Sequence, residues 1–126
     1  MTHERIGRKR LVVGAHYGTR DFIVQRMTAV IMAVYTLILV FYAVFVPSLG
    51  FESWRAFFVF TVGALPVGQM LATVAFLSLI WHAWVGVRDI WMDYARSDGL
   101  RLFLQVLTAL WLVAAAAFFI KILWSL

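Results

Sequence analysis

The stretch PVGQMLATVAFLSLIWHAWVGVRDIW, from Pro66 to Trp91, decides the fold class of this chain. It is longer than the roughly 20 residues that a helix needs to cross about 30 Å of hydrocarbon. Two further stretches, residues 22–46 and 102–124, have a similar length and character. None alternates apolar and polar residues as a strand does, and in lipid the backbone must satisfy its own hydrogen bonds. The sequence therefore predicts an all-α integral membrane protein with three transmembrane helices.

The composition agrees with this class. Of 126 residues, 64% are hydrophobic, 17% are aromatic and only 13% are charged. We expect residues 1–126 to form a single membrane domain, because three spans leave no room for a soluble catalytic domain. The chain contains no cysteine, which excludes disulfides and thiolate-ligated iron–sulfur clusters within it. Histidine is then the obvious metal ligand.

The segments between the spans differ in length. The first connector, residues 47–65, opens with helix-breaking residues and continues with the aromatic stretch Phe51–Phe58, which predicts a short helix at the membrane interface. Pro66 suits the first turn of the second span. The second connector is expected to be short, about Met92 to Arg101, with the turn residues Ser97-Asp98-Gly99.

The basic residues predict the orientation in the membrane. Residues 1–20 and the second connector region carry most of the arginine and lysine, whereas the first connector carries only Arg55. Because positive residues accumulate on the cytoplasmic side, we expect residues 1–20 to be a basic cytoplasmic segment and the second connector to be cytoplasmic too. The formal net charge of +5 then reflects topology and contact with anionic membrane lipid, and we expect no nucleic-acid partner.

His82 lies inside a predicted span, where a polar group needs a partner to offset its desolvation. At about 100° per residue it shares a small and polar stripe with Ser78, Gly86, Asp89 and Asp93, which we expect to face protein. Two roles fit its imidazole. It can hydrogen-bond a neighbouring helix, or it can ligate haem iron while an acceptor holds its second nitrogen. Gly86 would let either a flat macrocycle or another helix approach closely.

Two residues at the cytoplasmic end of the same span also have two possible roles. Tyr94 can donate its hydroxyl hydrogen to a quinone carbonyl, and Asp93 beside it can relay protons. Alternatively, Tyr94 is an aromatic-belt residue and Asp93 pairs with Arg96.

Arg26 lies about one turn into the first span. It can extend its guanidinium to the lipid headgroups, or it can pair with an anionic cofactor group such as a haem propionate. His3 and His16 precede the first span, so they are poor candidates for axial ligands. A haem with two histidine ligands would need its second ligand from another chain.

Two parts of the chain resemble a known family. The more specific part joins residues 82–86 (HAWVG) to Asp93-Tyr94, Leu100-Arg101-Leu102 and Gln105; the other joins residues 21–24 (DFIV) to Arg26 and Thr28-Ala29. Both resemble the small hydrophobic membrane anchor, the D-type subunit, of bacterial succinate dehydrogenase (complex II). The resemblance spans roughly residues 20–105, including the connector that contains Trp54, and the third span matches only in character.

The resemblance implies partners, cofactors and site residues. The partners are a second membrane anchor subunit, an iron–sulfur subunit and a flavoprotein subunit, with FAD and the iron–sulfur clusters only on the last two. His82 matches an axial ligand of haem b that is shared with the partner anchor, and Arg26 matches an arginine near the haem propionates. Tyr94 matches a tyrosine that hydrogen-bonds ubiquinone, with Asp93 beside it. One departure is Arg20, which stands where members of the family have a histidine.

These observations lead to one hypothesis with two alternatives. The chain is expected to be a multi-pass anchor in the bacterial inner membrane, with a cytoplasmic N-terminus, that does not oxidise succinate itself. Electrons from a partner's iron–sulfur cluster would reduce ubiquinone near Tyr94, with the haem held by His82 close by. The alternatives are a structural membrane adaptor without a redox centre and the anchor of a related fumarate reductase.

Overall fold

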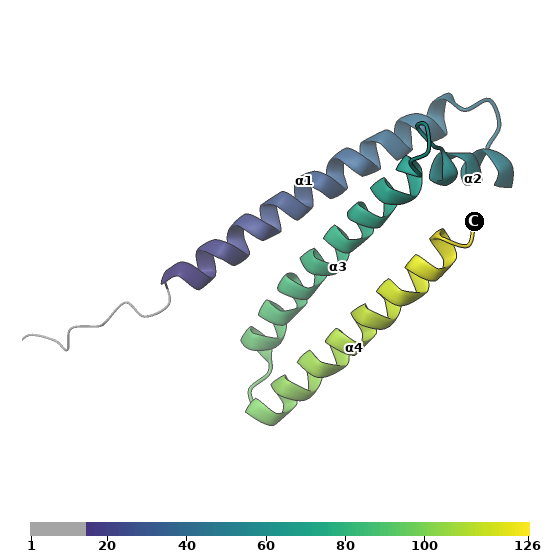
Figure 1. Ribbon diagram of the computed structural model, residues 1–126. Coiled ribbons are helices and arrows are strands. Elements are labelled where there is room, and N and C mark those ends of the chain that lie inside the picture. The colour runs from purple at the N-terminus through teal and green to yellow at the C-terminus, as the bar shows by residue number, and fades with distance from the viewer. Residues whose placement is uncertain (1–14) are drawn as a thin grey trace, which may run out of the picture.

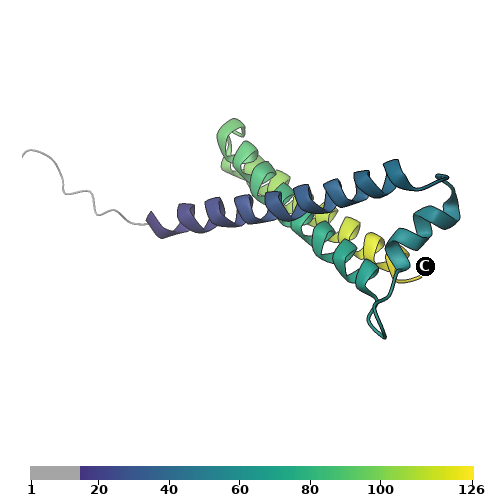
Figure 2. The same cartoon turned by 90° about the horizontal axis from the view of Figure 1, so that it is seen from above.

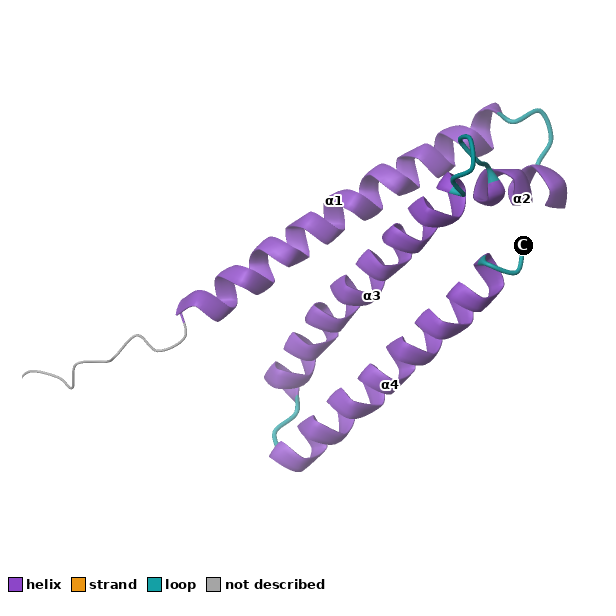
Figure 3. Cartoon of the chain, viewed as in Figure 1, coloured by secondary structure: helices purple, strands orange, loops and turns teal. Residues whose placement is uncertain are grey.

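The computed structural model describes the backbone of residues 15–126 and the side chains from Gly18 onward. This part of the chain contains no strand; its helices are α1 (Ala15–Phe45), α2 (Phe51–Val59), α3 (Val67–Tyr94) and α4 (Asp98–Leu123) (Figure 3). The helices α1, α3 and α4 are long and apolar enough to cross a membrane. The predicted all-α class with three spanning helices is therefore confirmed. The basic segment before residue 15 and the side chain of His16 lie outside the described residues.

The three long helices run alternately up and down, with α3 between α1 and α4 (Figure 1). Seen from above, α1 crosses α3 at an angle (Figure 2). The first residues of α1, the end of α3 and the start of α4 lie together, whereas α2 and the C-terminus lie at the opposite end. Arg20, Arg88 and Arg96 therefore share what we name the basic end of the bundle, and Arg55 lies at the other end.

The second connector is shorter than predicted. The α3 helix continues through Tyr94, and only residues 95–97 separate it from α4. The Ser97 side chain accepts a hydrogen bond from the Leu100 amide at 3.2 Å, which makes Ser97 an N-cap rather than a turn residue. Asp98 in the first turn is favoured by the helix dipole. The cap and this charge therefore start α4 about four residues before the predicted start at residue 102.

The first connector contains the short helix that the aromatic residues predict. The Ser53 hydroxyl bonds the Gly50 amide at 2.9 Å, and the Tyr42 hydroxyl of α1 donates to the Ser53 carbonyl. The Phe57 ring of α2 is buried against Tyr42, with ring centroids 4.9 Å apart. These contacts hold α2 against the end of α1.

Small residues line the buried face of α3, namely Gly68, Ala72, Ala75 and Ser78, followed by Val85. Their spacing of three to four residues places them on one side of the helix, where they let neighbouring helices approach closely. Ser78 of the predicted stripe is buried, as expected for a residue that faces protein. Asp89 and Asp93 are exposed in this single chain, so their contact with protein stays a prediction. Asp93 lies five residues beyond Arg88, whose side chain forms an ion pair with Asp21 of α1.

Candidate functional site

The His82 imidazole bonds two side chains of α1. Its Nδ1 lies 3.1 Å from the Thr28 hydroxyl, and its Nε2 lies 3.3 Å from the Gln25 amide nitrogen. Because an amide nitrogen can only donate, Nε2 accepts and Nδ1 carries the ring hydrogen. The Thr28 hydroxyl accepts that hydrogen and passes its own to the Val24 carbonyl at 2.8 Å. These contacts favour the tautomer with its hydrogen on Nδ1, which leaves the lone pair on Nε2.

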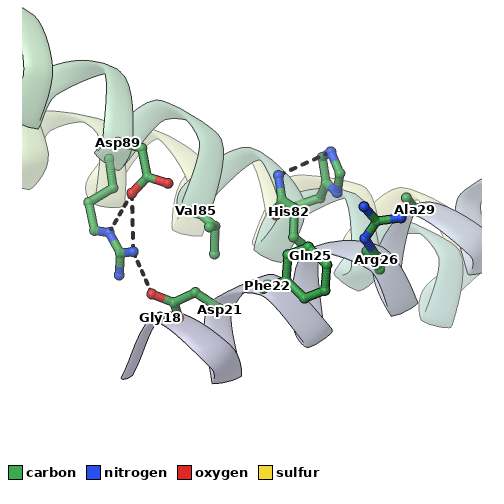
Figure 4. A pocket seen from close by; sticks show the side chains of 10 residues that line it. Gly18, Asp21, Phe22, Gln25, Arg26, Ala29, His82, Val85 and Asp89 are labelled. Atoms are coloured by element: carbon green, nitrogen blue, oxygen red, sulfur yellow. Dashed lines mark hydrogen bonds and ion pairs between the residues drawn. The ribbon is translucent and has the colours of Figure 1, made fainter. Parts of the chain in front are cut away.

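A cavity of about 680 Å³ lies beside this imidazole, between α1 and α3 (Figure 4). Its volume falls within the roughly 300–1,000 Å³ typical of small-molecule and cofactor sites. Gln25, Arg26 and Phe22 line it from α1, while His82, Val85 and Asp89 line it from α3. The structure thus brings together two residues that the sequence singled out, His82 and Arg26.

An ion pair between α1 and α3 lines the basic end of the cavity. The Arg88 guanidinium of α3 lies 2.7 Å from an Asp21 carboxylate oxygen of α1 and 3.2 Å from Asp89. The Arg88 and Asp21 side chains keep 28% and 37% of their surface exposed, so the pair is only partly removed from solvent. With two carboxylates on one guanidinium, Arg88 is neutralised within this chain, and the pair fixes α1 against α3 next to the imidazole.

Arg26 lines the cavity with a positive charge. It makes no ion pair with any described residue, and its guanidinium lies over the Phe22 ring, 4.6 Å from the centroid. The Arg26 side chain is exposed, and Figure 4 places it at the end of the cavity away from Asp21 and Asp89. A guanidinium in this state can take up an anionic group, because no carboxylate of the described chain competes for it.

Tyr94 and Asp93 do not belong to this cavity. Both are exposed, Tyr94 to 80%, at the last turn of α3. Tyr94 lies about 18 Å along the helix axis from His82 and is rotated by about 120° from it. Neither residue bonds a described residue: Asp93 does not pair with Arg96, and Arg96 makes no ion pair in the described part of the chain. The chain alone does not form an enclosed site around Tyr94.

The partners of His82 and the ion pair between α1 and α3 were not predicted from the sequence. Asp21, Gln25 and Thr28 are spaced by four and three residues, which places them on one face of α1. A polar face on an otherwise apolar helix is the signal that identifies them as residues that contact protein. The spacing does not say which helix they contact, so their pairing with His82 and Arg88 needed the structure.

Three apolar helices that hold an imidazole beside a cavity define an integral membrane protein with a candidate site between its helices. Residues 1–120 match the family described as "Succinate dehydrogenase/Fumarate reductase transmembrane subunit". The chain belongs to this family. One curated relative, the succinate dehydrogenase hydrophobic membrane anchor subunit of Coxiella burnetii (strain RSA 493 / Nine Mile phase I), is 29% identical over 107 residues, which cover 85% of this chain and 89% of that protein.

The resemblance to succinate dehydrogenase anchors is therefore confirmed. The chain is a multi-pass membrane anchor subunit of the succinate dehydrogenase and fumarate reductase type, and it belongs in a multi-subunit complex. The expected haem, quinone, orientation and individual partners stay predictions.

Proposed function

We propose that the chain is the membrane anchor of a succinate:quinone oxidoreductase in the bacterial inner membrane. In this proposal it contributes His82 as an axial ligand of haem b and Tyr94 with Asp93 to the ubiquinone-reduction site. The observation that carries the proposal is the placement of His82, whose Nδ1 lies 3.1 Å from the Thr28 hydroxyl while the ring lines a cavity. These contacts favour the tautomer that leaves the lone pair on Nε2. In a metal-ligating histidine, one ring nitrogen binds the metal through its lone pair and the other donates its hydrogen to an acceptor.

The residues around the cavity fit a haem. Thr28 supplies the acceptor that a ligating histidine needs, and Arg26 supplies a cation for a propionate. Gly86, beside the imidazole on α3, adds no side chain there. When bound, haem b supplies a one-electron redox centre. The second axial ligand would come from the partner anchor, because His3 and His16 precede the first predicted span.

Quinone binding is assigned to the end of α3. The Tyr94 hydroxyl would donate a hydrogen bond to a quinone carbonyl, and the Asp93 carboxylate would accept or return a proton during turnover. Both side chains are exposed, so residues of partner subunits would have to enclose the quinone. The site lies at the basic end, which the positive-inside rule makes cytoplasmic and which would face the iron–sulfur subunit.

Succinate oxidation belongs to the partners in this proposal. A flavoprotein would hold FAD, and an iron–sulfur subunit would deliver electrons to the quinone. Purification of the intact complex tests the assignment: we expect these two subunits, a second anchor and a haem b spectrum. The direction in which the complex turns over with a given quinone separates a succinate dehydrogenase from a fumarate reductase.

One observation favours an alternative without a redox centre. Both nitrogens of His82 already have partners on α1, as expected for an imidazole that serves only helix packing. A complex that contains all its subunits but no haem would establish this packing role.

The orientation can be tested with reporter fusions. A reporter after Ser97 is expected to be cytoplasmic, and reporters after Gly50 or Leu126 are expected on the opposite side. The reason is that the basic end carries Arg20, Arg88 and Arg96, and positive residues accumulate on the cytoplasmic side. The inverse pattern would place Tyr94 on the side away from its proposed electron donor and would contradict the mechanism.

Tyr94→Phe tests the quinone site. The change removes one hydroxyl, so quinone binding should weaken by about 0.5–1.5 kcal/mol, or about three- to tenfold. Succinate oxidation with a soluble artificial acceptor and the haem content should stay unchanged. Asp93→Asn should lower turnover at saturating quinone if the carboxylate relays protons. Wild-type kinetics of Tyr94→Phe at limiting quinone would identify Tyr94 as an aromatic-belt residue.

A further inference from the structure

The Gln25 side-chain amide hydrogen-bonds His82 Nε2, the atom through which the imidazole would bind a metal. The Gln25 amide nitrogen lies 3.3 Å from His82 Nε2 and donates a hydrogen bond to it. One lone pair cannot accept this hydrogen and ligate a metal at the same time. Uptake of a cofactor at His82 therefore requires the Gln25 amide to move away, and Figure 4 shows both side chains at the edge of the same cavity.

The Gln25 amide is only half satisfied in this position. Its Oε1 atom is buried and accepts no hydrogen bond from the described residues. A buried acceptor without a donor is unfavourable, so release of the amide loses one hydrogen bond but lets Oε1 find a partner. A Cβ built on Gly86 would lie 3.8 Å from the Gln25 amide nitrogen, so the α3 surface beside the amide is not tightly packed.

We propose that Gln25 is a positioning residue that competes with a metal-centred cofactor for His82 Nε2 and so sets the affinity of the site. The proposal rests on the assignment of His82 as haem ligand. Thr28 favours the same tautomer, because its hydroxyl hydrogen is donated to the Val24 carbonyl at 2.8 Å and its oxygen is left to accept the Nδ1 hydrogen. The Gln25 bond is thus an opposing interaction that exists only while the site is empty.

Two substitutions of Gln25 should act in opposite directions. Gln25→Leu removes the donor and frees Nε2, which should tighten haem binding about three- to tenfold, the ratio expected from one neutral hydrogen bond. Gln25→Glu introduces an acceptor that favours a hydrogen on Nε2, the tautomer that cannot ligate. Because bonds to a carboxylate are stronger, haem binding should weaken about tenfold or more.

The measurement uses the intact complex. Purified complexes are equilibrated with apomyoglobin as a haem acceptor, and the haem partition is read from the absorbance of each holoprotein. Gln105→Leu, the same change at a half-buried position of α4 outside the cavity, is the matched control and should leave the partition unchanged. A general loss of packing would weaken binding in both Gln25 variants, so the opposite signs isolate the effect on the imidazole.

The outcomes separate this inference from the haem assignment. If His82→Ala keeps its haem, the assignment of the ligand itself fails. If His82→Ala loses haem and Gln25→Leu binds it no more tightly than the wild type, the role of Gln25 is overturned and the ligand assignment stands.

Discussion

A complex that carries His82→Ala is expected to lose the low-spin absorbance of haem b. Alanine removes the imidazole and leaves Thr28 and Gln25 without the ring that they bond across the helix interface. The loss should exceed the roughly 10- to 100-fold drop in affinity that follows removal of an outer hydrogen-bond partner. Haem content per complex and the spectrum of the reduced state measure the effect.

Thr28→Val extends this experiment in a graded way. Valine keeps the shape of threonine but cannot accept the Nδ1 hydrogen, so haem affinity should fall by about 10- to 100-fold without removal of the ligand. Thr36→Val makes the same change on an exposed position of α1 and should have no effect.

The outcome that would contradict the ligand assignment is unchanged haem absorbance in His82→Ala. His82 would then not ligate the haem iron, and its role would be helix packing.

The helices themselves follow from the sequence because hydropathy and length are local properties. The apolar stretches around residues 22–46 and 66–91 predict α1 and α3 to within a few residues at most ends. The start of α1 is the exception, since the helix extends back to Ala15 through polar residues. The end of α3 is a smaller exception, because it extends through Asp93 to Tyr94. Polar residues end a stretch of high hydropathy, but they do not end the hydrogen-bonded backbone of a helix.

The site depends on information that a single stretch does not contain. Gln25 and Thr28 meet His82 only because α1 crosses α3 at one particular register, with more than 50 residues between the bonded pairs. The register is stabilised at one end by the ion pair of Arg88 with Asp21. At the opposite end of α3, Gly68 lies against α2, and its amide bonds the Phe60 carbonyl at 3.0 Å. This contact was not predicted from the sequence either. The candidate imidazole was predictable from its place in a span, whereas its partners on α1 were not.

Gly68→Ala should destabilise the anchor from the end of α3 opposite His82. A Cβ at Gly68 would collide with the Phe58 carbonyl oxygen and lie 2.8 Å from the Phe58 carbonyl carbon and 2.9 Å from Phe60 Cδ1. Because the main clash is with backbone, α2 would have to move and loosen the 3.0 Å bond from the Gly68 amide to the Phe60 carbonyl. Overpacking of this kind costs about 1–3 kcal/mol.

The expected results of Gly68→Ala are a lower temperature of thermal unfolding and a smaller yield of assembled complex. Gly99→Ala is the control, because a Cβ there meets nothing within 4 Å. Gly68 lies 14 residues, or about 21 Å along α3, from His82, so haem per assembled complex should stay normal. Wild-type stability of Gly68→Ala would show that α2 is not packed against α3 in the complex. Full assembly combined with haem loss would instead mean that the α2 contact controls the register of His82 against Thr28.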